Sequence, residues 1–254
     1  MAKQRVLVVG ASGGVGRACA LAAADAGYDL ALTYRGNEAA VRELAEAARA
    51  RGVDATIHRV DLADRASVDA LFADLAASQP DGPPVVGIVH AAGSRIEQPY
   101  VSRTDPDDWK RVIDADVNGF FHVVHAGLPT LRAHRGSLVF VSSAGIGRHP
   151  PGDILSVAPK AACEALVRAV AREEGRYGVR ANSVRLGIID TGMFPDLVAS
   201  GELDADYLAA ATRNTPLRRY GTAEEVAGVV LFLLSSAASY VTGQAIALDG
   251  GYSI

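Results

Sequence analysis

The sequence predicts an α/β fold in which helices cover both faces of a doubly wound parallel sheet, giving three layers. Two observations predict this class. Short apolar runs rich in Val, Ile and Leu alternate with longer runs of helix formers along all 254 residues, as repeated strand–helix units require. A glycine-rich turn separates the first apolar run from the first helical run. Since no low-complexity linker divides the chain, we expect one domain over residues 1–254.

The individual elements follow from the length and period of each run. Strands buried on both faces read as short continuous apolar runs, whereas helices are longer and rich in good helix formers. Strands are expected at residues 6–9, 30–34, 56–60, 85–90, 138–141, 181–186 and 245–248. Helices are expected at residues 17–26, 38–50, 68–76, 109–131, 161–177 and 224–235. Right-handed crossovers between such units give one open sheet.

The first strand leads directly into the glycine-rich turn, which reads Val-Gly-Ala-Ser-Gly-Gly-Val-Gly over residues 9–16. A strand, a glycine turn and a helix in that order direct unpaired N–H groups and a positive dipole end toward one point, which suits a pyrophosphate. Glycines allow the close backbone approach that such a ligand needs. We therefore predict a Rossmann-like dinucleotide site, with a simple tight turn as the alternative. The expected cofactor contacts are Gly10, Ser12, Gly14, Val15 and Gly16.

The end of the second predicted strand indicates which dinucleotide binds. Residues 33–37 read Thr-Tyr-Arg-Gly-Asn, so no carboxylate stands there to bind ribose hydroxyls. Arg35 would instead pair with a 2′-phosphate, which favours NADP(H) over NAD(H). A solvated loop arginine is the alternative interpretation. Asp61 and Leu62, after the third strand, are expected to contact the adenine.

Composition and charge exclude several other classes. A net charge of -4 gives no reason to expect nucleic acid or an anionic membrane as partner. No apolar run is long enough to span a bilayer and the N-terminus does not read as a signal peptide, so we expect a cytoplasmic protein. Cys19 and Cys163 are expected as buried reduced thiols. His122 and His125 have a spacing that a metal can use, but no further ligands complete a set, so no metal is expected.

Further motifs follow the glycine loop in a fixed order. They are Asp-Leu at 61–62, His-Ala-Ala-Gly at 90–93, Asp-Val-Asn-Gly at 116–119, Ser-Ser-Ala-Gly at 142–145, a lysine at 160 and Asp-Gly-Gly at 249–251. With the glycine loop, this ordered set resembles the short-chain dehydrogenase/reductases of the single-domain type. The resemblance runs over nearly the whole chain, and it implies an NAD(P)-dependent oxidoreductase.

The resemblance also implies an active site built from an Asn, a Ser, a Tyr and a Lys. Asn118 matches the Asn that holds a water and a helix bend, and Ser143 matches the Ser that hydrogen-bonds the substrate oxygen. Lys160 matches the Lys that binds the nicotinamide ribose and assists proton transfer. Further cofactor contacts that it implies are Ala91, Gly93, Ile189 and Thr191.

The tyrosine of the family is absent from its expected position. It should lie four residues before the Lys and thirteen after the Ser, and both spacings lead to Ser156. An aliphatic hydroxyl is a far weaker acid than a phenol beside an ammonium group. Pro159 is unusual as well, because it lacks an N–H and restricts the residue before it. We therefore expect the helix that carries Lys160 to begin near Pro159.

Three functional interpretations follow from Ser156. In the first, the protein is an atypical reductase whose proton comes from water relayed through Ser156, Lys160 or Asn118, or from another side chain. The other side chains considered are His149, Asp153 and Tyr207. Reduction of a conjugated C=C suits this interpretation, because an enolate need only be stabilised and then protonated by solvent; carbonyl reduction is the commoner family chemistry. The second is an NADP(H)-binding sensor or scaffold, and the third is non-redox dehydration, isomerisation or cyclisation.

The remaining expectations concern the substrate and the assembly. Residues 193–214 mix apolar and acidic side chains where this family has a substrate lid, so we expect a lid near residues 190–215. Residues 212–219 resemble enoyl-thioester reductases of this fold, so the substrate is expected to be small or carried as a thioester. The resemblance implies a homotetramer or homodimer formed through the predicted helices 109–131 and 161–177 and the C-terminal strand.

Overall fold

Seven parallel strands form one sheet in the computed structural model, which describes residues 3–78, 82–199, 201 and 205–254. The strands are β1 (Arg5–Val9), β2 (Asp29–Tyr34), β3 (Ala55–Arg59), β4 (Val85–His90), β5 (Ser137–Ser143), β6 (Arg180–Leu186) and β7 (Ala245–Leu248). Their spatial order is β3-β2-β1-β4-β5-β6-β7. The chain therefore builds outward from β1 to β3 and then crosses back to β4, which leaves a crevice at the carboxyl ends of β1 and β4.

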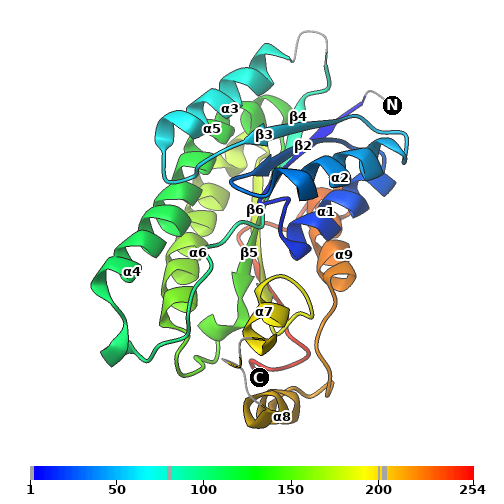
Figure 1. Cartoon of the computed structure of the whole chain (residues 1–254). Helices are drawn as coiled ribbons and strands as arrows, with labels where there is room; N and C mark the ends of the chain where they lie inside the picture. The colour runs from blue at the N-terminus through cyan, green and yellow to red at the C-terminus, as the bar shows by residue number, and fades with distance from the viewer. Residues whose placement is uncertain (1–2, 79–81, 200, 202–204) are drawn as a thin grey trace.

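Helices cover both faces of this sheet (Figure 1). They are α1 (Gly14–Asp25), α2 (Glu38–Arg49), α3 (Arg65–Ala77), α4 (Pro106–Val112), α5 (Gly119–His134), α6 (Ile154–Glu174), α7 (Met193–Ala199), α8 (Ala205–Asn214) and α9 (Ala223–Leu234). Helices α1, α2 and α9 lie on one face, and α3, α4, α5 and α6 lie on the other. This arrangement confirms the predicted three-layered, doubly wound fold. None of the helices in the described ranges combines the length and the hydropathy that a bilayer crossing needs.

Strand β1 shows why short apolar runs predict this fold. All five of its residues are buried. Val6 and Val8 pack into the core beneath α1 and α9, whereas Leu7 and Val9 pack into the core on the opposite face. Because successive side chains of a strand point to opposite faces, a strand with helices on both sides must be apolar throughout.

The predicted helix over residues 109–131 is in fact three segments. Helix α4 ends at Val112, a π-helical segment spans Ile113–Asn118, and α5 begins at Gly119. A π-helical turn inserts one extra residue per turn, so it changes the direction in which the following side chains point. Hydrophobic periodicity alone did not distinguish this segment from a continuous helix.

The prediction that the helix carrying Lys160 begins near Pro159 is wrong. Helix α6 begins at Ile154, so Pro159 lies inside it. The carbonyl of Asp153 accepts hydrogen bonds from the N–H groups of Ser156 and Val157, at 3.1 and 2.9 Å. Burial of Val157 and its neighbours anchors this first turn, and these contacts offset the single hydrogen bond that the proline removes.

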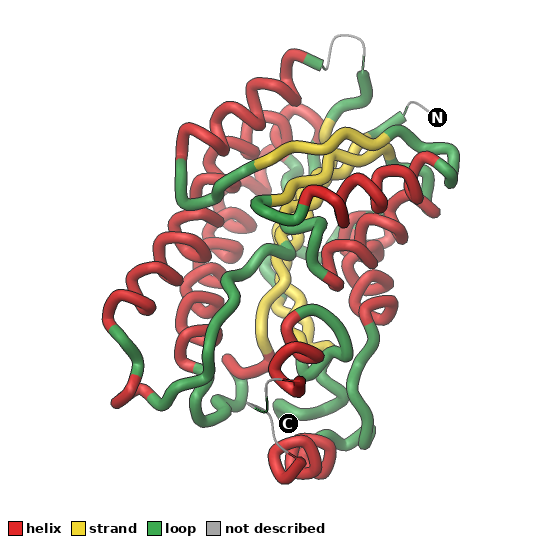
Figure 2. Tube along the Cα trace, viewed as in Figure 1, coloured by secondary structure: helices red, strands yellow, loops and turns green. Residues whose placement is uncertain are grey.

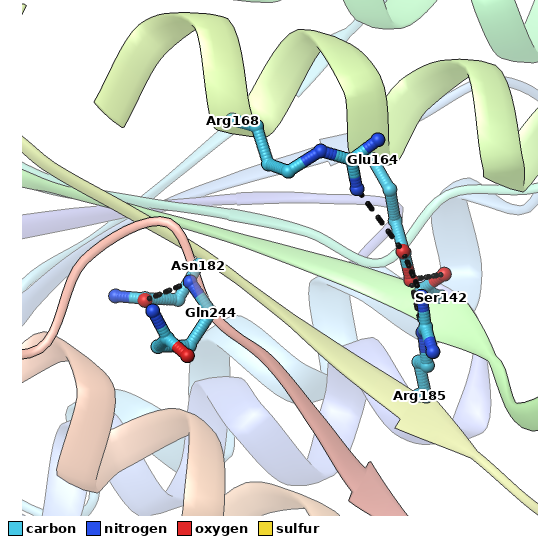
Figure 3. Close-up of polar contacts among 6 residues, drawn as sticks. All are labelled: Ser142, Glu164, Arg168, Asn182, Arg185 and Gln244. Atoms are coloured by element: carbon cyan, nitrogen blue, oxygen red, sulfur yellow. Dashed lines mark hydrogen bonds and ion pairs between the residues drawn. The ribbon is translucent and has the colours of Figure 1, made fainter. Parts of the chain in front are cut away.

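A buried carboxylate fixes α6 against the sheet (Figure 3). Glu164 of α6 accepts hydrogen bonds from Ser142 Oγ of β5 at 2.7 Å and from Arg185 Nη2 of β6 at 2.6 Å. Arg168 adds a longer ion pair of 3.9 Å. In the same view, Asn182 of β6 accepts a hydrogen bond from the backbone that leads into β7. A buried carboxylate is stable only when it is paired, so this contact fixes how α6 lies across β5 and β6.

Candidate functional site

A cleft of about 280 Å³ opens at the carboxyl ends of the strands in the N-terminal half. Ligands of open α/β sheets bind at this edge. Seven of the predicted cofactor residues line the cleft: Gly10, Ser12, Arg35, Asp61, Leu62, Ala91 and Gly93. The structure therefore brings together residues from four separate loops that were chosen by motif alone.

The glycine loop leads into α1 at the floor of this cleft. A Cβ on Gly14 would overlap Thr191 Oγ1, and a Cβ on Gly16 would overlap the carbonyl oxygen of Gly10. The side chain of Val15 is partly buried and packs against the apolar core. The first turn of α1 holds no acidic residue, and its N–H groups suit a bound anion.

Arg35 lines the cleft at the end of β2, and Arg59 lies beside it. Arg35 is exposed, and its carbonyl accepts a hydrogen bond from Arg59 Nε at 3.3 Å. Arg59 was not predicted, although its place at the end of β3, in register with Tyr34, is a signal that could have found it. The nearby Glu38 is held by Arg42, whose Nε lies 2.7 Å from Glu38 Oε1. Hydrogen bonds from Arg42 and then Tyr34 lower the pKa of this carboxyl.

The loop after β4 is tied to the π-helical segment. Asp116 Oδ1 accepts hydrogen bonds from Ser94 N at 2.9 Å and Ser94 Oγ at 2.7 Å. His90 lines the cleft beside this loop, and its buried Nδ1 has no hydrogen-bond partner in the described part of the chain. Burial and, to a smaller extent, the charge of Lys160 lower its pKa to about 3, so His90 stays neutral.

His122 and His125, whose spacing a metal could use, each contact other groups of the protein. His122 Nδ1 lies 3.0 Å from the carbonyl oxygen of Leu62, and the His125 ring stacks on Phe121 with the centroids 6.0 Å apart. The residues that the structure describes contain no group of three ligands that could hold a metal ion. Cys19 and Cys163 are buried free thiols, as predicted.

A polar cluster lies at the end of β5 and the start of α6. Lys160 Nζ is 3.4 Å from Ser156 Oγ, and Ser156 hydrogen-bonds the carboxylate of Asp153. Residues 153, 156 and 160 share one helix face because their spacing is i, i+3 and i+7. The position that a Cβ on Gly145 would occupy lies 3.1 Å from Ser143 Oγ and 3.2 Å from Asp153 Oδ2. Ser143 and Asp153 therefore both approach Gly145 from the same side.

The carboxyl group of Asp153 is strongly perturbed. Burial raises its pKa to about 6, against the opposing effects of Lys160, His149 and the Ser156 hydrogen bond. Two phenols face the same carboxylate, Tyr207 of α8 and Tyr252 near the C-terminus. Burial raises the pKa of both phenols, and the negative charge of Asp153 raises it further.

The hydrogen bond that Asn118 makes does not involve this cluster. It is the last residue of the π-helical segment and is exposed, and its Nδ2 donates a hydrogen bond to Asp114 Oδ1 at 3.0 Å. The side chain is therefore engaged along its own helix, and its predicted catalytic role stays a prediction.

The segment after β6 returns to the glycine loop and then forms two short helices. Ile189 is buried and pairs with Gly221 in an isolated bridge, and Thr191 contacts Gly14. Helices α7 and α8 lie near the C-terminus at one end of the molecule (Figure 2). The ring of Phe194 meets that of Tyr220 edge-on, with the centroids 4.9 Å apart. Residues 200 and 202–204 of the predicted lid lie outside the described residues.

Comparison with known proteins agrees with this geometry. The profile of the family described as Enoyl-(Acyl carrier protein) reductase matches residues 10–253. The 3-oxoacyl-[acyl-carrier-protein] reductase FabG of Staphylococcus aureus is 33% identical over 246 residues, which cover 96% of each chain.

Two solved structures show the same fold with a nicotinamide cofactor bound. A gluconate 5-dehydrogenase from Burkholderia cenocepacia, in complex with NADP and tartrate, has a TM-score of 0.89 at 26% identity over 100% of this chain and 96% of its own. A 3-oxoacyl-[acyl-carrier protein] reductase from Brucella melitensis with bound NAD has a TM-score of 0.86 at 27% identity, covering 100% and 92%. The chain belongs to the short-chain dehydrogenase/reductase family of oxidoreductases.

Proposed function

We propose that this protein is an NADP(H)-dependent reductase that transfers hydride to a carbonyl or a conjugated C=C of a small or thioester-bound substrate. In this proposal Ser156 occupies the position of the family tyrosine. The observation that carries it is the continuity of the two halves of the site. His90 lines the cofactor cleft, and the positive charge of Lys160 contributes to the lowered pKa of its imidazole. Lys160 Nζ in turn lies 3.4 Å from Ser156 Oγ. The cleft and the polar cluster are therefore neighbours.

The residues present fit a dinucleotide. Gly14 and Gly16 let α1 pack directly against Thr191 and the Gly10 carbonyl, and the N–H groups at the start of α1 would hold the pyrophosphate. Lys160 would hold the nicotinamide ribose, and Thr191 and Ile189 would lie beside the carboxamide. The reduced nicotinamide supplies a hydride.

Arg35 supports NADP(H) as the cofactor. Its guanidinium is exposed at the end of β2, Arg59 is hydrogen-bonded to its carbonyl, and the nearby Glu38 is paired with Arg42. A dianionic 2′-phosphate between two guanidinium groups gains charge-assisted hydrogen bonds, whereas a ribose hydroxyl would gain little. The gluconate dehydrogenase complex holds NADP, although the Brucella reductase holds NAD.

The side chains of the polar cluster match the needs of hydride acceptance. Negative charge develops on the substrate oxygen as carbon accepts a hydride. Ser143 Oγ would donate a hydrogen bond to that oxygen, and the ammonium group of Lys160 would stabilise the charge through Ser156. Position 156 lacks a phenol, so this site stabilises the oxyanion without the usual tyrosine proton.

Carrier-bound thioesters are the proposed substrate class. The relative from Staphylococcus aureus acts on 3-oxoacyl groups of an acyl carrier protein by its name, and the matching family is described as enoyl reductases. We place α7 and α8 over the substrate as the lid. Exposed aromatic side chains support the predicted homotetramer or homodimer; they are Trp109 at 38%, Phe121 at 51% and Tyr177 at 41% exposure.

A labelling experiment tests the function. The protein is incubated with NADPH deuterated at the 4S position and with ketones and conjugated enones, including thioesters. Deuterium on a carbinol carbon identifies carbonyl reduction, and deuterium on a β-carbon identifies C=C reduction. The missing phenol favours two alternatives, which are an NADP(H)-binding sensor and a non-redox enzyme. Tight NADPH binding without any label transfer would support these alternatives.

A further inference from the structure

Ser156 leaves the reduction without its usual proton donor, and a carboxyl group lies beside it. We propose that Asp153 is the general acid of this enzyme and gives its proton to the substrate oxygen held by Ser143. This inference rests on the proposed reductase function. It assigns a catalytic role to a residue that lies outside the motifs of the family.

The geometry around Gly145 supports the proposal. One point beside this glycine lies 3.1 Å from Ser143 Oγ and 3.2 Å from Asp153 Oδ2. A Cβ there would come within 2.7 Å of Val157 Cγ2, so the point shows how closely the two side chains approach Gly145 and is not itself a binding position. Ser143 Oγ and Asp153 Oδ2 are therefore at most about 6.3 Å apart, a gap that one substrate oxygen hydrogen-bonded to both groups can bridge.

The helix face that carries Asp153 also supplies its supporting groups. Ser156 hydrogen-bonds Asp153 and lies 3.4 Å from Lys160 Nζ, so the serine hydroxyl connects the acid to the ammonium group. This contact orients the carboxyl group. The positive charge of Lys160 stabilises the carboxylate that remains once the proton has left. Ser156 is therefore a positioning residue in this scheme.

The hydroxyl groups near Asp153 are weaker acids than its carboxyl group. An aliphatic hydroxyl such as that of Ser156 holds its proton too tightly at neutral pH. Burial raises the pKa of the Tyr207 and Tyr252 phenols above the ordinary value. Burial places the pKa of Asp153 at about 6, where a group is protonated often enough to donate and acidic enough to release its proton.

The titratable groups that face Asp153 come from four parts of the chain. Lys160 lies on its own helix and His149 on the preceding loop, and both favour the carboxylate. Tyr207 of α8 and Tyr252 of the C-terminal segment face it as neutral phenols. The burial effect exceeds the sum of the opposing charges, since the pKa of Asp153 is raised overall. The group is nevertheless only partly buried, so water can reprotonate it.

The step balances in atoms and electrons. The substrate carbon accepts a hydride with its electron pair, for which the reduced nicotinamide is the source, and the C=O π bond breaks toward oxygen. A new O–H bond forms at that oxygen as the carboxyl O–H bond of Asp153 breaks. The Asp153 carboxylate then takes a proton from water, so one hydride and one proton are consumed in each turnover.

The test compares Asp153→Asn and Asp153→Glu with a matched control, Asp108→Asn, which changes an exposed aspartate of α4 that pairs with Arg111. For the unmodified enzyme we expect kcat for reduction to fall as pH rises through about 6. Asp153→Asn is expected to lose about 100-fold in kcat at pH 6, the lower end of what a general acid contributes. Its kcat should also no longer fall as pH rises through about 6. NADPH affinity, measured by fluorescence, should not change. Asp153→Glu should recover part of the rate, and the control should behave as the unmodified enzyme.

A second measurement is independent of turnover. In protein labelled with ¹³C at the aspartate carboxyls, the resonance that disappears in Asp153→Asn should titrate near pH 6. Titration near pH 4 would overturn the proposal, and so would an Asn variant that keeps the normal rate and its fall with pH. Failure of the unmodified enzyme to transfer deuterium to any ketone or enone would contradict the reductase function instead.

Discussion

The two ends of the cleft follow the family pattern to different degrees. At the cofactor end, the glycine loop and the loops after β3 and β4 hold the expected residues in the expected order. At the substrate end, Ser156 stands at the position where the resemblance predicts a tyrosine, and Pro159 lies within the helix that carries Lys160. Dinucleotide binding uses backbone N–H groups of a local turn, so it tolerates little change in the glycines. Proton transfer uses one side chain, and a neighbour on the same helix face, such as Asp153, can supply it.

The largest expected effect is at Lys160. Lys160→Ala should reduce hydride transfer by at least about 100-fold, because the oxyanion loses its nearest positive charge and the ribose loses a partner. Single-turnover oxidation of NADPH measures this rate. Lys3→Ala is the matched control, since Lys3 is an exposed lysine 3.5 Å from Asp29. Near-normal turnover in Lys160→Ala would mean that the reaction takes place elsewhere.

Restoring the phenol sharpens the comparison between the two ends. Ser156→Tyr should make the reaction independent of Asp153, because a phenol beside Lys160 is the usual donor of the family. The double variant Ser156→Tyr with Asp153→Asn should therefore regain at least about 10-fold of the rate that Asp153→Asn alone loses. A double variant as slow as Asp153→Asn would show that position 156 no longer faces the substrate oxygen. Steady-state kcat at pH 6 and pH 8 provides the comparison.

The cofactor end has its own test at Arg35. Arg35→Asp should weaken NADPH binding by about 10-fold. This is the lower end of the range for a hydrogen bond to a charged group, and we choose it because water and salt screen the exposed guanidinium. NADH affinity should change far less, since NADH lacks the 2′-phosphate. Fluorescence titrations with both cofactors measure the ratio. Equal losses for NADPH and NADH would remove the argument for a 2′-phosphate site.

Asp153 should also affect the pH dependence of stability. Its pKa is raised in the folded protein from 3.8 to about 6, so the native state binds a proton more tightly than the unfolded state. The stabilisation is present below pH 3.8 and is lost as pH rises through about 6. The unmodified protein should therefore lose stability between pH 4 and pH 8 that Asp153→Asn does not lose. The free energy of unfolding of the variant, minus that of the unmodified protein, should rise by about 1 kcal/mol over this range, a value discounted for the partial exposure of Asp153. Urea unfolding at the two pH values measures this difference. A constant difference would contradict the raised pKa.

The sequence predicted the sheet well because each strand is apolar on both faces, as β1 illustrates. The meeting of the predicted residues in one cleft was also predictable, because they lie in short loops at strand ends, where position along the chain determines position in space. The start of α6 was not. Proline rules predicted a helix beginning near Pro159, but burial of Leu155 and Val157 keeps the preceding turn helical.

Asp153, the acid proposed for the substrate end, shows a different limit. The sequence named Asp153 among several possible donors and gave no means to choose between them. The choice depends on burial and on the approach of Ser143 across Gly145, which are properties of the folded chain. Arg59 was missed for a similar reason, since its proximity to Arg35 comes from the pairing of β2 with β3.

The most direct test of the central claim is deuteride transfer by the unmodified enzyme. The protein is incubated with 4S-deuterated NADPH and with ketones and enones, free and as thioesters, and the products are analysed by mass spectrometry and NMR. The proposed function predicts deuterium on a carbinol carbon or on a β-carbon, with the label absent when Lys160→Ala is used. Tight NADPH binding with no deuterium in any product would contradict it and would favour a sensor or a non-redox enzyme built on this fold.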